Sequence, residues 1–186
     1  MNSYSIALFF HIVGAMGFFL ALGLEWTGLW QLRSALLSQE VRTWMSLLKS
    51  ARRGGLASML AVVISGVYMM ATAWSRVAWL IVTVGSLVVV IVLSLALSGP
   101  RMAAIGRALV TEQGAVSQTF HRLANHPLLW ISIQTRVAIT LGIVLLKTAR
   151  PDLSVSLLII GVAIVLGLAS ALPMPRRERA YEGSAD

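Results

Sequence analysis

Hydrophobic residues fall into five long blocks along the chain, separated by shorter polar segments. The first block, Tyr4 to Leu24, contains 21 residues without Asp, Glu, Lys or Arg. A helix of that length crosses a hydrocarbon core of about 30 Å at about 1.5 Å per residue. The pattern predicts an all-α, polytopic membrane helical bundle whose five transmembrane helices lie at about residues 4–30, 55–74, 77–98, 127–147 and 153–172.

The segment between the first two predicted spans is not a simple loop. Residues 31–53 contain no Gly or Pro, and they carry an apolar stripe on one helix face. We expect an amphipathic cytoplasmic helix here, which continues or bends from the first span and anchors at the interface or covers the inner end of the bundle. A partner-binding role for it is the alternative. Residues 1–175 are predicted to form a single bundle, and the polar residues 176–186 a disordered tail.

The composition changes the interpretation of the charge. The chain is 58% hydrophobic and only 12% charged, with a net charge of +8 and no cysteine. In a soluble protein this basic balance would indicate nucleic acid, but here Lys and Arg lie at the ends of apolar blocks, which indicates membrane topology and anionic lipid at the cytoplasmic face instead. The absence of cysteine excludes disulfides, thiolate catalysis and iron–sulfur ligation.

The basic residues also predict an orientation. Of the 15 Lys and Arg, eleven lie in the segment 31–53, the segment 101–124 and the C-terminal tail, whereas only Arg76, Lys147 and Arg150 lie in the alternate loops. The positive-inside rule then places the N-terminus outside and the C-terminus in the cytoplasm, which an odd number of spans requires. We expect a multi-pass protein of a bacterial inner membrane, with a homo-oligomer or a membrane partner subunit possible.

Ionisable residues inside a span are costly and mark candidate functional positions. His11 and Glu25 share one face of the first predicted helix with small residues, which would allow a neighbouring helix or a flat cofactor to approach closely. Arg136 lies near the middle of the fourth predicted span, on a stripe with Ser132.

One hypothesis is a cofactor site. Met69 and Met70 are predicted at about the same depth as His11, and a His–Met pair suits haem b axially or Cu(I) with one further ligand. Arg136 would then hold a propionate or another anion. His11 is the candidate metal ligand in this hypothesis. The alternative is that His11 forms an interhelical hydrogen bond and the methionines only pack.

A second hypothesis joins Glu25 and Arg136 as an intramembrane polar pair. In antiparallel helices their side chains lean toward one another, although their Cα atoms are predicted to differ in depth by about 15 Å. Such a pair would be a structural lock or a gate. At the start of the fourth span, His126 precedes Pro127 and is expected to cap the helix.

The stretch Leu8-Phe9-Phe10-His11-Ile12-Val13-Gly14-Ala15 resembles the start of small bacterial integral-membrane proteins of predicted-only function. More distantly it is similar to the copper-resistance D and membrane protoporphyrinogen-oxidase types, which begin with a spanning helix that bears a histidine followed by small residues. The resemblance implies haem ligation by His11. Two classes of function therefore stay open: a redox or accessory protein that binds haem b or copper through His11, and a structural or small-solute transport protein that uses Glu25 and Arg136.

Reporter fusions test the predicted orientation. Fusions near Leu37, Ala108 and Ala180 should give a cytoplasmic signal, and fusions near Trp74 and Arg150 an external one, because the basic segments stay inside. An external signal at Ala180 would mean that one apolar block does not span the membrane.

Overall fold

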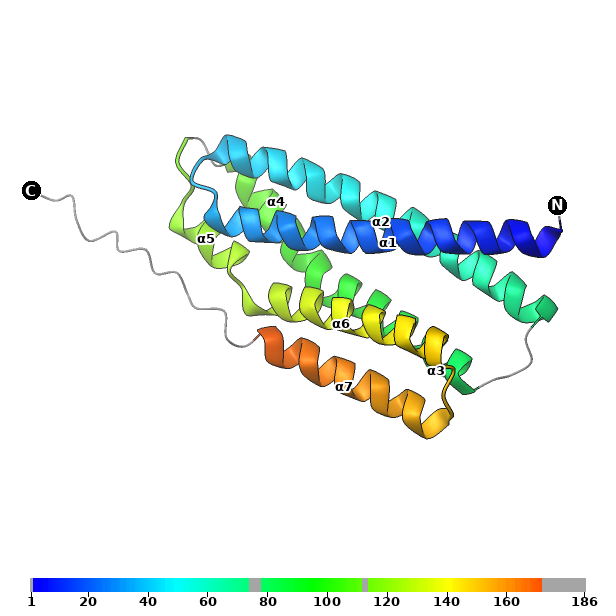
Figure 1. Ribbon diagram of the computed structural model, residues 1–186. Coiled ribbons are helices and arrows are strands. Elements are labelled where there is room, and N and C mark those ends of the chain that lie inside the picture. The colour runs from blue at the N-terminus through cyan, green and yellow to red at the C-terminus, as the bar shows by residue number, and fades with distance from the viewer. Residues whose placement is uncertain (1, 74–77, 112–113, 172–186) are drawn as a thin grey trace, which may run out of the picture.

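The computed structural model describes residues 2–73, 78–111 and 114–171, and this part of the chain is all-α apart from an isolated bridge (Figure 1). Its helices are α1 (Ser3–Ser34), α2 (Ser38–Ala73), α3 (Ala78–Leu93), α4 (Gly99–Thr111), α5 (Gln118–Ala124), α6 (Pro127–Ala149) and α7 (Leu153–Ala171), with a π-helical segment η1 (Ser94–Ser98) between α3 and α4. The predicted C-terminal tail lies outside the described residues.

Five helical stretches are long and apolar enough to cross a membrane, which confirms the predicted fold class. They are Ser3–Ser34, Ser38–Thr72, Ala78–Val110, Gln118–Ala149 and Leu153–Ala171. The stretch that contains α6 differs from the rest. In its most apolar 18-residue segment 56% of the residues are buried, whereas 11–22% are buried in the corresponding segments of the other four stretches. Helix α6 is therefore the central helix, and the others present large apolar side chains to lipid.

The predicted amphipathic helix is not a separate element. The chain reverses after α1, and α2 then runs as one helix of 36 residues through Gly54 and Gly55, where a boundary was expected. Two glycines cost a helix roughly 1 kcal/mol each relative to alanine. Gly55 also serves packing, since a Cβ added there would lie 2.9 Å from the Cβ of Ala21. Close contact with α1 keeps the helix continuous.

The predicted end of the third span at Gly99-Pro100 is also not a helix end. The π-helical segment η1 joins α3 to α4, and the Gly99 amide donates to the carbonyl of Ser94, five residues earlier. Proline has no amide hydrogen and its ring clashes with the carbonyl four residues back in an α-helix. The wider π turn accommodates Pro100 without a break.

Helices α1 and α2 contain 32 and 36 residues, so each is longer than the roughly 20 residues that a hydrocarbon core requires. The excess forms a headpiece at one end, made of the last turns of α1, the first half of α2, α4 and α5 (Figure 1). Its core is closed by the fully buried Leu32, Val41, Ile105 and Phe120. Most of the predicted apolar stripe of residues 31–53 packs into this core, although Leu37 is exposed.

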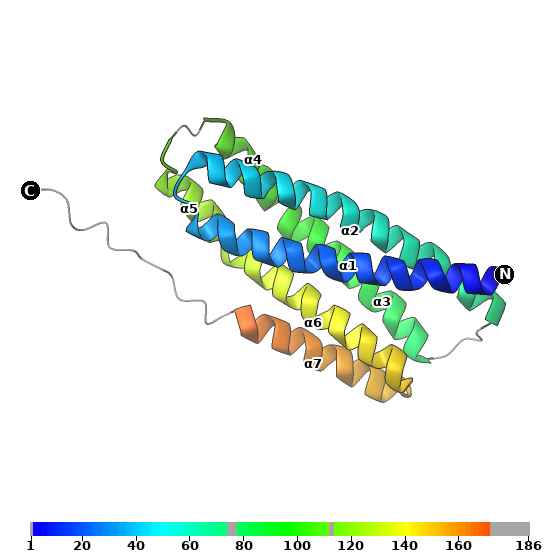
Figure 2. The same ribbon diagram turned by 45° about the horizontal axis from the view of Figure 1, so that its top comes forward.

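Beyond the headpiece the helices form two groups, which both views show (Figures 1 and 2). The hairpin consists of α1 and α2, which pack along each other, and the α6 group consists of α3, α6 and α7. Outside the headpiece the backbones of the two groups approach closely at few places. Met59 of α2 shares a buried apolar cluster with Val82 of α3 and Ile139 of α6, and Phe18 of α1 packs against it. Helix α1 begins at the end opposite the headpiece, and α7 ends at the headpiece end (Figure 1).

Small residues bring α1 and α2 together, as expected for the His11 face. A Cβ added at Gly14 would lie 2.9 Å from the carbonyl oxygen of Ser58 and 3.0 Å from a Val62 methyl group. An added Cβ at Gly28 would lie 2.8 Å from the Leu48 side chain. Helices in lipid associate through this kind of close backbone approach, because apolar side chains gain little by leaving lipid.

Gly14→Leu should therefore destabilise the protein far more than Leu8→Ala. The leucine would overlap the backbone of α2, and overpacking costs about 1–3 kcal/mol. Leu8 is 39% exposed, so its truncation should change stability by about 0.5 kcal/mol or less. The measurement is the free energy of unfolding in detergent. Equal losses for the two variants would show that the α1–α2 contact is not close.

Candidate intramembrane ion-pair site

Glu25 of α1 and Arg136 of α6 form a bidentate ion pair within the apolar part of the bundle. Arg136 Nη2 lies 2.7 Å from Glu25 Oε1, and Arg136 Nη1 lies 2.9 Å from Glu25 Oε2. The side chain of Arg136 is 4% exposed and that of Glu25 is 23% exposed. Parallel N–H···O bonds of this kind fix both the distance and the orientation of the two groups.

The remaining donors of Arg136 are also used. Nη1 donates to Ser94 Oγ at 3.5 Å, Nη2 to Ser98 Oγ at 3.3 Å, and Nε to the Ser132 carbonyl at 3.3 Å. A guanidinium has five N–H donors, so every one has an acceptor. Two of these acceptors belong to the π-helical segment η1, which directs both serines toward Arg136.

The serine hydroxyls form a directed chain. Ser98 Oγ accepts from Arg136 and donates to Ser132 Oγ at 2.9 Å, and Ser132 Oγ donates to the Leu93 carbonyl at 3.1 Å. A buried polar network is stable only when each member has its partners. The hydrogen bonds of the two hydroxyls therefore extend the polar network around Arg136 to the last residue of α3.

The two charged groups meet because α1 is displaced along its axis relative to α6. His11 contacts Lys147, so the N-terminal turns of α1 project past the end of α6. From this contact, Glu25 lies 14 residues along α1 and Arg136 lies 11 residues along α6, or about 21 and 16 Å. The predicted depth difference of about 15 Å assumed that the two helices end at the same level.

His11 lies at a junction of three helices. Its Nδ1 is 3.1 Å from the Val62 carbonyl and 3.2 Å from Ser65 Oγ, both on α2, and its Nε2 contacts Lys147 Nζ on α6. A carbonyl only accepts, so the hydrogen belongs on Nδ1, and Nε2 then accepts from the lysine. Both ring nitrogens are occupied in this arrangement.

The structure does not bring the four predicted cofactor residues together. His11 lies opposite Val62, Ser65 and Gly66, one turn before Met69, and Met70 is 39% exposed. Arg136 lies about 16 Å along α6 from the contact of His11 with Lys147, and it has no donor left for a propionate. Within the described residues no group of three or more His, Cys, Asp or Glu side chains is arranged to hold a metal ion.

The hydrophobic pattern assigns Lys147 to a loop, because it lies at the end of an apolar block, and so it misses the contact with His11. A signal was nevertheless present. Lys147 follows Arg136 by 11 residues, three turns on the same face of α6, just as Glu25 follows His11 by four turns on α1. Two antiparallel helices with such spacings can match both pairs.

His126 caps α6 as predicted, accepting from the Leu128 amide at 3.3 Å.

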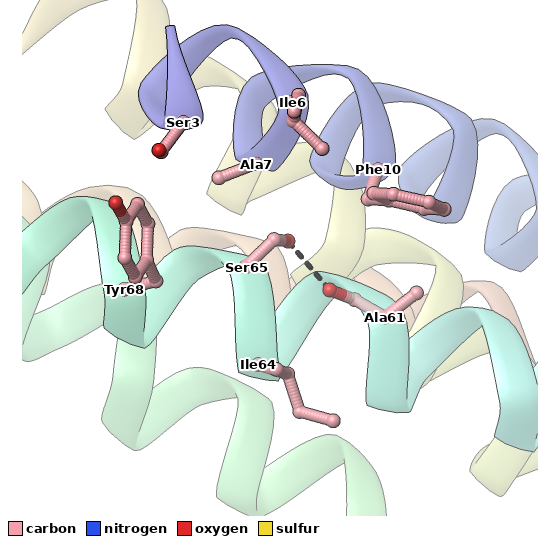
Figure 3. Close-up of a pocket in the computed structure, with 8 residues that line it drawn as sticks. All are labelled: Ser3, Ile6, Ala7, Phe10, Ala61, Ile64, Ser65 and Tyr68. Carbon is pink, nitrogen blue, oxygen red and sulfur yellow. Dashed lines mark hydrogen bonds between the residues drawn. The ribbon is translucent and has the colours of Figure 1, made fainter.

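A groove of about 570 Å³ lies between α1 and α2 near the N-terminus (Figure 3). It is lined by Ser3, Ile6, Ala7, Phe10, Ala61, Ile64, Ser65 and Tyr68. Ile6, Phe10 and Ile64 are exposed, so the groove opens onto the surface that faces lipid. The Ser65 hydroxyl bonds to the Ala61 carbonyl (Figure 3). The groove walls carry no charge, which suits an acyl chain of the bilayer.

Five candidate spans and an internal ion pair indicate the class of protein, a multi-pass helical membrane protein. Comparisons with protein-family models, curated proteins and solved structures found no match for this chain.

A double-mutant cycle measures how strongly the ion pair is coupled. Glu25→Met should lower the free energy of unfolding by about 3–5 kcal/mol, because it leaves the Arg136 charge buried without a counter-ion. Glu25→Met/Arg136→Met should recover most of that loss, since apolar replacement of a whole buried pair is often neutral. A double variant that loses the sum of both single losses would show that the two residues act independently.

Proposed function

We propose that the protein is a gated transport protein for a small solute, and that the ion pair of Glu25 and Arg136 is its gate. This is the second of the two functions that the sequence leaves open. The observation that carries it is the position of the pair: an ion pair with a buried arginine joins two helical groups. Outside the headpiece these groups otherwise meet mainly through the apolar side chains of Phe18 and Met59 and the contact of His11 with Lys147. A bacterial inner membrane and a cytoplasmic headpiece fit the distribution of basic residues.

In this proposal the headpiece is the fixed end about which the two groups move, and the ion pair holds them closed. The core of the headpiece holds the hairpin and the start of α6 together at one end. At the other end, the hydrogen-bonded link described between hairpin and α6 is the contact of His11 with Lys147. Separating the groups between these ends requires that Arg136 lose its carboxylate. Glu25 is the more exposed member of the pair, at 23% against 4% for Arg136, so a cationic solute would compete with Arg136 for its carboxylate.

Haem or copper binding through His11 stays a prediction, and the hydrogen bonds of His11 do not favour it. A metal at Nε2 would have to displace Lys147, and a metal at Nδ1 would have to displace the Val62 carbonyl. The nearest predicted methionine lies a turn away. The residues present therefore do not fit such a ligand in this arrangement.

The gate is tested by solute flux in proteoliposomes. Glu25→Gln should raise the efflux of small polar solutes such as glycerol, K⁺ and acetate by about tenfold or more, since a loss of about 1.4 kcal/mol of closure changes the open population tenfold. Glu40→Gln is the matched control, because Glu40 is an exposed carboxylate in the headpiece that accepts from the Leu36 amide at 3.2 Å.

Because the chain has no cysteine, a single introduced cysteine can report on access to the site. Thr140 is 5% exposed and lies one turn from Arg136 on α6. Thr140→Cys should react with a small water-soluble thiol reagent faster in the Glu25→Gln background than in the parent. Unchanged flux together with unchanged labelling, in a variant that has lost stability, would show that the ion pair is only a structural lock.

A further inference from the structure

A basic cluster lies where α2 leaves the headpiece. Lys49, Arg52 and Arg53 occupy one turn of α2, and all three are exposed. The part of the chain that the structure describes holds three of the seven acidic residues. Glu25 pairs with Arg136, Glu40 bonds to the Leu36 amide, and Asp152 caps α7. No ion pair is described for the three basic residues of the cluster.

The same face of α2 turns from basic to apolar within one turn. Continuing from Lys49 and Arg53 at steps of three and four, the next residues on this face are Leu56, Leu60 and Ile64, which are 62%, 53% and 68% exposed. Large apolar side chains with this exposure face acyl chains in a membrane protein. The change of character therefore marks the boundary between headgroups and hydrocarbon.

Two independent helix lengths put the boundary at the same level. From Arg53 to Ala73 there are 20 residues of α2, or about 30 Å of helix, which equals the thickness of a hydrocarbon core. From Gly99 back to the start of α3 at Ala78 there are 21 residues, or about 31 Å. The guanidinium of Arg52 reaches Gly99, since its Nη2 would lie 3.4 Å from a Cβ added there. The cluster thus spans α2 and the start of α4 at headgroup level.

From these observations we infer a binding site for the phosphate of an anionic phospholipid in the leaflet at the headpiece end. Lys49, Arg52 and Arg53 bind the headgroup phosphate, and an acyl chain of the same lipid lies along Leu56 and Leu60. Clusters of Lys and Arg at the end of a membrane helix recognise anionic lipid in this way, and the apolar continuation of the face selects a lipid over a soluble anion. The inference goes beyond the proposed gate and does not depend on it.

Lipid adducts of the full-length protein, counted by native mass spectrometry from detergent, test this site. Dioleoylphosphatidylglycerol should bind the parent more tightly than dioleoylphosphatidylcholine does. Arg52→Gln/Arg53→Gln should weaken phosphatidylglycerol binding about 25-fold, at about fivefold for each lost cation near the surface. Arg42→Gln/Arg107→Gln removes the same charge from exposed headpiece positions farther from the boundary, and it should leave binding within about threefold of the parent.

Further arms separate the alternatives. Because Arg52 reaches α4, Lys49→Gln/Arg53→Gln gives a second variant that keeps this contact, and it should lose affinity to a similar extent. Equal losses in both charge-matched variants would overturn the site in favour of a general charge effect. Competition by inorganic phosphate at the lipid's own concentration would assign it to a soluble anion. If the parent bound phosphatidylcholine as tightly as phosphatidylglycerol, the negative charge of the lipid would have no role in binding, which would overturn the proposal.

Discussion

The charge of Arg136 is the constraint on which the arrangement of the membrane part depends. A guanidinium does not lose its proton in a protein, so a buried arginine must find a counter-ion and acceptors for all its donors. Helix α1 supplies the carboxylate of Glu25, and the π-helical segment supplies the hydroxyls of Ser94 and Ser98. These contacts fix the rotation of α1, η1 and α6 about their axes, and the stretch that contains α6 is also the most buried span.

Two kinds of packing meet at this site, a core of large apolar side chains in the headpiece and close backbone contact between the spans. In the headpiece, the fully buried Val41, Ile105 and Phe120 form a core of the kind that a soluble domain has. In the spans, exclusion from water no longer distinguishes inside from outside, and Gly14 instead permits close approach of backbones. The ion pair adds direction where apolar packing has little, and it holds the hairpin to the α6 group.

Sequence periodicity predicted the five spans, the small-residue face of α1 and the candidate partners Glu25 and Arg136, because each depends on local spacing. Helix ends were less predictable. Gly54-Gly55 and Gly99-Pro100 both indicated breaks, but contact with Ala21 and a π turn maintain the helices through them. Relative displacement of helices is not a local property at all. The depth of Glu25 against Arg136, and the contact of Lys147 with His11, follow from an axial shift of α1 that no single segment specifies.

Two polar contacts of α1 with α6, that of Glu25 with Arg136 and that of His11 with Lys147, differ in how fully their donors are satisfied. His11, Phe18 and Glu25 follow one another at intervals of seven residues on one face of α1, and Phe18 packs between the two hydrophobic cores. At the contact of Glu25 with Arg136, every donor of the guanidinium has an acceptor within the protein. At the contact of His11 with Lys147 the lysine side chain is exposed, so solvent competes for its donors. The contact of His11 with Lys147 is therefore the weaker of the two, and Phe18, an apolar side chain on the same face of α1, lies between it and the ion pair.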